Sequence, residues 1–383
     1  MFYKKIAKAF IGGFIVIFLS ILGGYIIIDP LDMWSVAKLR GINNYKVSQP
    51  LNLDLFKPYQ YMNSKPDIVF LGSSRVYVGM PPYFPNSSGT KVYNMGFSSL
   101  TLQDAYKYIW FMNSVHKPKQ IYLGLDFFQF DKKFSKSRRV GFSAERLERL
   151  SQNQLEAFLY KIHETIGLRK MLRKTIAESR ENPESPPLFI NGWDVRRGGA
   201  PARNKEEFPR TVQALFDDYR GWELDSDAID TLREIVNFTR KNNIQLVLFF
   251  NPILSDHVAV LDISNQLQNF NMVKNRVAQI NPVWDFAFVN GLTADRSWFY
   301  EASHYRGKLG EKILEVMTRS NDSGGEIGVL ISKTNVVPEI SAQMDEYQAW
   351  KERHYNYFSL LKYHYLSNMS VTNSEMINWK YYD

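Results

Sequence analysis

The sequence predicts an α/β protein: a three-layer sandwich in which helices cover both faces of a parallel sheet, joined to an N-terminal transmembrane helix and interrupted by a helical insertion. Three observations lead to this prediction. An uncharged apolar run fills residues 10–28. Short apolar runs alternate with helical periodicity after residue 66, which is typical of a parallel sheet. A segment rich in arginine and lysine, residues 131–225, separates the two halves of that alternation.

The composition supports a folded core and excludes several classes of site. Of the 383 residues 45% are hydrophobic and 22% are charged, which excludes disorder as a description of the whole chain. The absence of cysteine excludes disulfides, thiolate metal sites and a cysteine nucleophile. The six histidines include no close pair, so we expect no histidine-rich metal site. We also expect no other metal ion and no cofactor. A net charge of +8 favours anionic partners such as lipid headgroups or acidic glycans, and does not by itself indicate nucleic acid.

The run from Phe10 to Ile28 predicts a membrane anchor. At about 1.5 Å per residue it spans about 28 Å, close to the hydrocarbon thickness of a bilayer. Three lysines lie before it and two aspartates soon after it, so residues 1–29 should form a cytoplasmic stub and a single-pass anchor, with the remainder outside. A cleaved signal peptide is the alternative. The run is long for one, and no Ala-x-Ala-like site follows.

Residues 30–66 read as an irregular linker or cap, and the α/β domain should comprise residues 67–130 and 226–318. Each expected strand is a short apolar run that ends at a turn signal, such as Gly72-Ser-Ser74 or Asn251-Pro252. The expected strands are residues 67–71, 91–94, 120–125, 244–250 and 283–289. Apolar side chains at helical spacing predict helices at 102–115 and at 227–242, the second with Ser226 as its N-cap.

The basic insertion and the C-terminal tail each allow two interpretations. Residues 143–180 should form a long helix or a helix pair, which is either a solvated cap or a surface for polyanions or anionic lipid. The tail, residues 319–383, is rich in tryptophan, tyrosine and phenylalanine. It is either a helix packed on the domain, the simpler interpretation, or a platform on which carbohydrate stacks.

Four polar or glycine-bearing motifs follow the apolar runs. In an open parallel sheet ligands bind outside the carboxyl ends of the strands, so motifs at those ends are candidate site residues. The motifs are Gly72-Ser-Ser-Arg75, Asn94-Met-Gly96, Gly124-Leu-Asp126 and Glu301-Ala-Ser-His304. A serine needs a base to take its proton as it attacks, and a carboxylate can orient an imidazole base. Together these motifs supply all three groups.

In this order the motifs resemble the blocks of the SGNH (GDSL) hydrolase superfamily, and are most similar to its membrane-anchored branch of DltD and AlgJ/AlgX-like proteins. The resemblance implies a flavodoxin-like sheet over residues 66–130 and 226–316. It implies that Ser74 is the nucleophile and that Ser73 takes the place of the usual aspartate. The amides of Ser74 and Gly96 would form the oxyanion hole, His304 would be the base, and Glu301 would take the position of the acid.

Two features depart from that pattern or compete with it. The third block normally supplies an asparagine to the oxyanion, and Asp126 stands at its position. Because an ionised carboxylate would repel the developing charge, either another group donates or Asp126 points elsewhere. His257, which follows the expected strand at residues 244–250, is a rival base that we rank behind His304.

The resemblance implies a membrane-anchored serine acyl-transfer enzyme outside the bacterial inner membrane, in the periplasm. It would be an O-acetyltransferase or O-acetylesterase that acts on a cell-envelope or exported polysaccharide, with a membrane-bound acyl-donor partner in the case of transfer. Two alternatives stay open. One is a lipase or thioesterase-type carboxylesterase, and the other is a catalytically silent glycan-binding assembly subunit, which the aspartate at position 126 favours.

Overall fold

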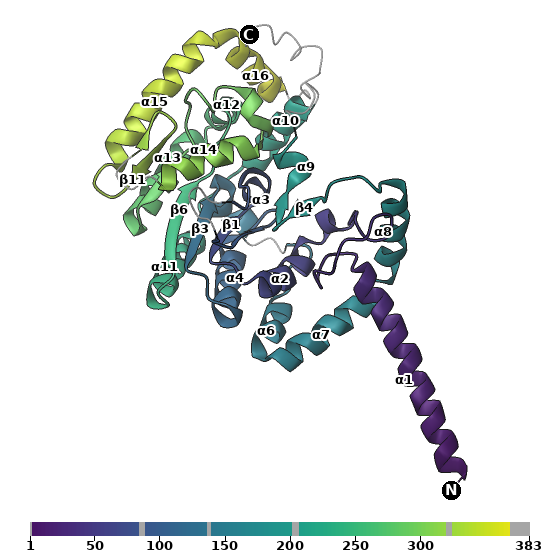
Figure 1. The fold of residues 1–383 in the computed structure, drawn as a ribbon. Helices are drawn as coiled ribbons and strands as arrows, with labels where there is room; N and C mark the ends of the chain where they lie inside the picture. Colours follow the sequence, from purple (N-terminus) through teal and green to yellow (C-terminus); the bar gives the residue numbers. More distant parts are fainter. Residues whose placement is uncertain (1, 84–88, 136–138, 201–206, 319–323, 368–383) are drawn as a thin grey trace. The chain divides into compact units, whose positions relative to one another are not determined.

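The computed structural model describes residues 2–83, 89–135, 139–200, 207–318 and 324–367 (Figure 1). The chain forms two compact units. The N-terminal unit comprises Met1–Ser64 and Gly141–Phe189, and the α/β unit comprises Lys65–Val140 and Ile190–Asp383. The segment expected as one insertion, residues 131–225, is therefore divided between the two units.

The α/β unit is built on a mostly parallel sheet, which confirms the expected fold class. In the described part of the chain the strand order is β10-β11-β7-β6-β3-β1-β2, and only the pairs that involve β10 and β11 are antiparallel. The strands are β1 (Ile68–Gly72), β2 (Val92–Gly96), β3 (Gln120–Leu125), β6 (Gln245–Phe250), β7 (Val283–Asp285), β10 (Gly324–Gly325) and β11 (Gly328–Ile331). Counted along the chain, the five parallel strands have the doubly wound order 2-1-3-4-5.

Helices form a layer on each face of this sheet (Figure 1). Helix α11 contacts both α4 and α13, whereas α3 contacts α14. Right-handed crossovers in this strand order place these two groups on opposite faces. The helices of the two layers are α3 (Ser74–Gly79), α4 (Leu102–Val115), α11 (Ser226–Lys241), α13 (Leu267–Ile280) and α14 (Gly307–Thr318). The unit also contains η2 (Phe127–Phe130), α5 (Lys132–Ser135), β5 (Trp193–Asp194), α9 (Val195–Gly198), α10 (Glu207–Tyr219), α12 (Ser255–Ile263), η3 (Arg296–Trp298), β8 (Phe299–Glu301) and β9 (His304–Tyr305).

The expected strands and helices of the α/β unit agree with the structure to within two residues, with two corrections. Strand β7 ends at Asp285, earlier than the predicted residue 289, because the carboxylate of Asp285 accepts the amide of Ala287 at 2.9 Å and turns the chain. The prediction of Ser226 as an N-cap is wrong. Asp225 caps α11 by accepting the amide of Asp227, and Ser226 is the first helical residue.

The C-terminal tail extends the sheet and then packs as helices. Strand β11 pairs antiparallel with β7, and two helices, α15 (Val336–Arg353) and α16 (Tyr355–Ser367), follow. Trp350 and Phe358 are buried, whereas Tyr355 and Tyr363 are exposed. The buried rings favour the packed helix over the stacking platform. Strands in the tail had no signal in the sequence analysis.

The N-terminal unit is helical, and its elements correct two expectations. It contains α1 (Phe2–Ile28), η1 (Gln49–Leu51), α2 (Leu53–Ser64), α6 (Ala144–Gln152), α7 (Gln154–Gly167) and α8 (Arg169–Glu181), and β4 (Phe189–Ile190) lies at its boundary. The segment expected as a helix or helix pair is three helices, because Asn153 caps α7 and Leu168 separates α7 from α8. The segment expected as irregular contains α2 despite Pro58. A proline there removes the hydrogen bond to the carbonyl of Asp54, which instead accepts from Arg146 at 3.4 Å.

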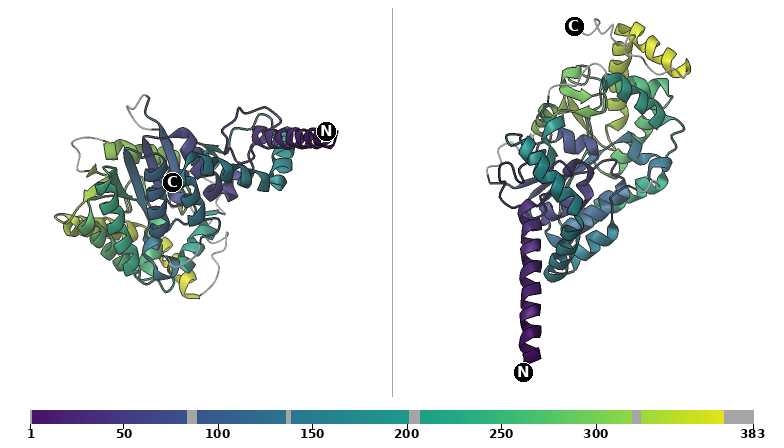
Figure 2. Two further views of the ribbon diagram at one scale, coloured as in Figure 1. Left: turned by 90° about the horizontal axis from the view of Figure 1, so that it is seen from below. Right: turned by 90° about the vertical axis from the view of Figure 1, so that its right-hand side faces the viewer.

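Helix α1 is long and apolar enough to cross a membrane. None of its most apolar 18-residue window is buried, unlike the core helix of a soluble domain. The right-hand view of Figure 2 shows α1 as one straight helix that extends away from the other helices of its unit. No second helix of this kind occurs in the part of the chain that the structure describes.

Candidate functional site

A cavity of about 310 Å³ lies at the carboxyl edge of the sheet, where β1 and β3 end. Ligands of doubly wound sheets bind at such a point, because the chain order reverses between these two strands. The cavity is lined by Ser74, Arg75, Ser99, Phe128, Asp131, Lys133, Phe134, Leu215, Asp218, Tyr219 and Ser303. Ser74 is thus the one predicted catalytic residue among its lining residues.

The turn after β1 distinguishes its two serines. Gly72 has φ = 157°, and a Cβ there would lie 2.4 Å from Val76 Cγ2, so the turn needs glycine. Ser73 is fully buried, and its hydroxyl accepts the amide of Arg75 at 3.1 Å as the N-cap of α3. Ser74 is half-buried and faces the cavity. The structure therefore gives Ser73 a capping role and leaves Ser74 available for chemistry.

His304 and Glu301 form a pair on the β8–β9 hairpin. Nδ1 of His304 is hydrogen-bonded to one carboxylate oxygen of Glu301, and the other oxygen accepts the amide of Ser303 at 3.0 Å. Burial opposes ionisation of Glu301, but His304 and the Ser303 amide outweigh it and lower the pKa of Glu301 to about 2. Nε2 of His304 is buried and has no hydrogen-bond partner among the described residues. This arrangement leaves Nε2 free to accept a proton.

Arg75 links the two predicted catalytic segments. Its Nε donates to the carbonyl of Ser303 at 2.8 Å and its Nη2 to the Ser303 hydroxyl at 3.1 Å. The residue before Arg75 is Ser74, and the residue after Ser303 is His304. Within the described residues no hydrogen bond joins Ser74 to His304 directly. The hydrogen bonds between Arg75 and Ser303 thus connect the segment of Ser74 with the segment of His304. The hydrogen bond expected between nucleophile and base is not formed among the described residues.

Two further contacts hold the hairpin, one with α3 and one with the residue that follows β6. The ring of Tyr305 covers Gly79, where a Cβ would lie 2.0 Å from it. The hydroxyl of Tyr305 donates to Asn251 Oδ1 at 3.0 Å, and Asn251 directly follows β6. The hairpin that carries His304 is therefore positioned by residues from β6 and α3.

Asp126 is paired with a cation. Its Oδ1 lies 2.8 Å from Nη1 of Arg75 and also accepts from Asn251 Nδ2 at 3.2 Å. Both charged side chains are buried. The carboxylate that stands at the oxyanion asparagine's position thus points to Arg75, which is one of the two outcomes that the sequence analysis left open.

The expectation for Gly96 needs correction. Its amide donates at 2.9 Å to Oδ1 of Asn94, and both residues are buried. An amide that is already donated cannot stabilise an oxyanion in this conformation. A Cβ at Gly96 would lie 2.7 Å from the backbone nitrogen of Tyr77, so close packing against α3 explains the glycine. Of the predicted oxyanion donors, the amide of Ser74 in the first turn of α3 has no acceptor among the described residues.

His257 lies in a different environment from His304. It is buried, and its Nε2 lies 2.5 Å from the hydroxyl of Tyr219. Burial, together with the nearby Arg75, holds the pKa of His257 well below its ordinary value, so the imidazole is neutral. It is not among the residues that line the cavity beside Ser74. Its contacts are those of a structural histidine.

The sequence analysis named Arg75 only as the end of the first motif and gave it no role, and it missed the aromatic wall of the cavity. The signal for Arg75 was present: an arginine directly after the candidate nucleophile, and an aspartate at the end of a strand that the fold places beside it. Phe128, Phe134 and Leu215 form the apolar part of the wall, and Asp218 and Lys133 add charge. Burial raises the pKa of Asp218 above its ordinary value.

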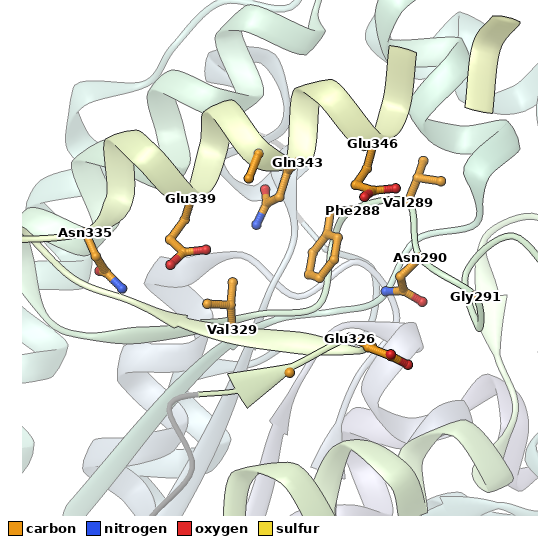
Figure 3. A pocket seen from close by; sticks show the side chains of 12 residues that line it. Phe288, Val289, Asn290, Gly291, Glu326, Val329, Asn335, Glu339, Gln343 and Glu346 are labelled. Carbon is orange, nitrogen blue, oxygen red and sulfur yellow. The ribbon is translucent and has the colours of Figure 1, made fainter. Parts of the chain in front are cut away.

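A second cavity, of about 580 Å³, lies between strand β11, helix α15 and the segment that follows β7 (Figure 3). Three glutamates, Glu326, Glu339 and Glu346, line it. No predicted site residue lines this cavity, and no cluster of potential metal ligands is found among the described residues.

Comparison of the chain with protein-family models and with curated proteins gives no match.

Proposed function

We propose that this protein is a membrane-anchored serine acyl-transfer enzyme in which Ser74 is the nucleophile, His304 the base and Glu301 the residue that orients the base. The observation that carries the proposal is the pairing of His304 with the buried carboxylate of Glu301, which leaves Nε2 of His304 without a hydrogen-bond partner among the described residues. Arg75 ties that pair to the segment that presents Ser74 to a cavity.

The reaction would begin with attack of Ser74 Oγ on an ester carbonyl, while His304 Nε2 takes the hydroxyl proton. Glu301 is ionised near neutral pH, because its pKa is lowered to about 2, so it can stabilise the imidazolium that forms. The imidazolium then protonates the departing alkoxide, and the acyl group stays on Ser74. Water completes hydrolysis, and a sugar hydroxyl completes transfer.

The oxyanion would be bound by the amide of Ser74, beside Arg75, which also lines the cavity. Loss of one oxyanion donor typically costs about 3–4 kcal/mol of transition-state stabilisation. A second amide donor would require Gly96 to exchange its hydrogen bond with Asn94 for one with the substrate.

A small acyl group on an exported or cell-envelope glycan is the substrate class that we favour. A cavity of about 310 Å³ lies at the small end of ligand pockets and suits an acetyl group on one sugar better than a long acyl chain. Phe128 and Phe134 offer ring faces, and Asp218 and Lys133 offer polar contacts. Helix α1 would hold the enzyme at the membrane, outside the cytoplasm, beside a membrane-bound acyl-donor partner in the case of transfer. The reaction needs no cofactor.

A silent glycan-binding subunit is the second candidate. Two observations favour it: Ser74 and His304 share no hydrogen bond among the described residues, and the amide of Gly96 is already donated. Neither observation favours a lipase or thioesterase, which the small cavity also disfavours.

Labelling with a fluorophosphonate separates these candidates. The full chain should be labelled, Ser74→Ala should not be labelled, and the matched variant Ser73→Ala should retain labelling if it folds, because Ser73 only caps α3. Turnover of p-nitrophenyl acetate should exceed that of longer esters. Retained turnover in Ser74→Ala would exclude the proposed mechanism, whereas a folded wild type without labelling or turnover would favour the binding subunit.

A further inference from the structure

Helix α7 of the N-terminal unit exposes a stripe of apolar side chains. The stripe consists of Leu155, Phe158, Leu159 and Ile166, which are 66%, 49%, 55% and 45% exposed. Their spacing of three, four and eleven residues from the first places them on one face of a helix. Ile162 falls on the same line and is half-buried. A row of large apolar side chains open to water indicates a surface with a partner.

The other side of α7 is firmly packed within its own unit. Ala157 and Thr165 are buried. The carboxylate of Glu164 accepts from the hydroxyl of Tyr59 at 2.6 Å and from Arg146 at 2.8 Å. These contacts fix the rotation of α7 about its axis, so the exposed stripe is not a core face that has turned outward.

Helix α7 lies beside the end of α1, and hydrogen bonds fix the chain between the two helices. Helix α1 contacts both α7 and α8. The side chains of Asn43 and Lys46 donate to the carbonyls of the last two residues of α1 at 2.6 and 3.2 Å. A cation at this end also complements the helix dipole. Trp34 Nε1 then donates to Thr165 of α7 at 3.0 Å. The direction of α1 is therefore coupled to the position of α7.

The surroundings of the stripe suit the surface of a bilayer. The ring of Phe158 packs edge-on against the ring of Trp34, with centroids 6.0 Å apart, and tryptophan is enriched at membrane interfaces. Figure 1 shows α7 and α8 both beside the C-terminal end of α1. Helix α8 adds four exposed cations, Arg169, Lys170, Arg173 and Lys174. Apolar and basic surfaces at the end of a membrane-spanning helix together match anionic phospholipid.

We propose that α7 lies along the leaflet surface at which α1 ends, with its apolar stripe inserted among the lipid chains and α8 against anionic headgroups. Amphipathic helices of this kind bury their apolar face about 5–10 Å into the boundary between headgroups and chains. The unit is thus held at the membrane by two contacts, which fix its tilt as well as its distance. The proposal rests on α1 crossing the bilayer and is independent of the catalytic function.

The test uses cysteine labels, because the natural chain has no cysteine. Full-length single variants Phe158→Cys and Leu159→Cys probe the stripe, and Glu156→Cys and His163→Cys on the polar side of α7 are matched controls. Ile15→Cys reports insertion of α1. Each is labelled with a polarity-sensitive fluorophore and reconstituted into vesicles of phosphatidylcholine with phosphatidylglycerol. Some vesicles carry a nitroxide quencher on the upper acyl chain.

Labels on the stripe should emit at shorter wavelength than the polar-side labels and be quenched several-fold more strongly by the nitroxide lipid. Changing the four α8 cations to glutamine, or omitting phosphatidylglycerol, should weaken this contrast. Equal quenching on the two sides of α7, with the label in α1 quenched, would overturn the proposal. Shorter-wavelength emission without lipid quenching would also overturn it, since a protein would then cover the stripe. An unquenched label in α1 would remove its premise.

Discussion

The guanidinium of Arg75 lies 2.8 Å from the carboxylate of Asp126, and both side chains are buried. The two residues follow neighbouring parallel strands, β1 and β3, so the fold brings the charges together at the edge where ligands bind. The same guanidinium also holds the backbone and hydroxyl of Ser303. One buried ion pair therefore joins the end of β3, the first turn of α3 and the hairpin that carries His304.

Removal of one partner of this pair should strongly destabilise the protein. In Asp126→Asn the buried Arg75 loses its counter-charge, and breaking a buried pair in this way typically costs about 3–5 kcal/mol. Asp230→Asn is the matched control, because Asp230 pairs with Arg233 on the exposed face of α11 and should change the free energy of unfolding little. Urea unfolding of the three proteins provides the comparison.

A double variant separates stability from positioning. Arg75→Met with Asp126→Leu replaces the pair by apolar groups, which is often neutral for stability. We expect the free energy of unfolding to recover toward the wild-type value while ester turnover stays low, because Ser303 loses its two hydrogen bonds to Arg75. Full recovery of turnover in this variant would show that Arg75 does not position the hairpin.

The local elements were predictable because their signals are local. The period of α4 and the apolar run of β3 gave their bounds, since each depends on side chains within one element. The end of β7 depended on one aspartate side chain that accepts a backbone amide. Helix α2 continues past Pro58, and the carbonyl that this proline leaves free accepts from Arg146, far along the chain. Such compensation has no period that a sequence pattern could reveal.

The candidate site was predictable in its members and not in its contacts. The resemblance placed Glu301 and His304 in one block as acid and base, and the structure pairs them. By contrast, the Gly96 amide could bind an oxyanion only if Asn94 did not accept its hydrogen bond. Residue types alone do not decide which acceptor the amide has. The partner of Asp126 required the strand order, because β1 and β3 are neighbours in space and not in the chain.

Glu301→Gln should lower the rate without reaching the floor of Ser74→Ala. The amide can keep the orientation of His304, but the imidazolium loses its charge partner. In the wild type the pKa of Glu301 is lowered to about 2, so loss of activity between pH 7 and pH 4 should not report protonation of this carboxyl. Initial rates against pH for the two proteins check both points.

Stability should respond to acid in a matching way. The folded pKa of Glu301 lies below its ordinary value of 4.5, so its ionised form contributes stability that is present above about pH 4.5 and lost as pH falls toward 2. Wild type should therefore lose more free energy of unfolding between pH 5 and pH 3 than Glu301→Gln does. Equal losses in the two proteins would contradict the lowered pKa.

His257→Gln should retain most ester turnover while destabilising the fold. His257 is buried and neutral, and its replacement leaves the hydroxyl of Tyr219 with a poorer partner, at a cost of about 1–3 kcal/mol. His304→Gln should differ in turnover, which should be lost, because its Nε2 has no partner among the described residues and is the proposed proton acceptor. The reverse pattern would make His257 the base.

The orientation of the chain in the membrane follows from charge on the two sides of α1. Lys4, Lys5 and Lys8 precede the apolar run, and Asp29 follows it, so the N-terminus should stay in the cytoplasm. Alkaline phosphatase fused after Ser64, at the end of α2, should be active, and a cytoplasmic fluorescent reporter at the same position should be dark.

An N-terminal sequence that begins near residue 30 would mean that α1 is a cleaved signal. Because Asn43 and Lys46 bond the last carbonyls of α1, cleavage would also remove contacts of the N-terminal unit, and we therefore expect the intact N-terminus. A dark phosphatase with a bright cytoplasmic reporter would place the cavity beside Ser74 in the cytoplasm and exclude an exported glycan as its substrate.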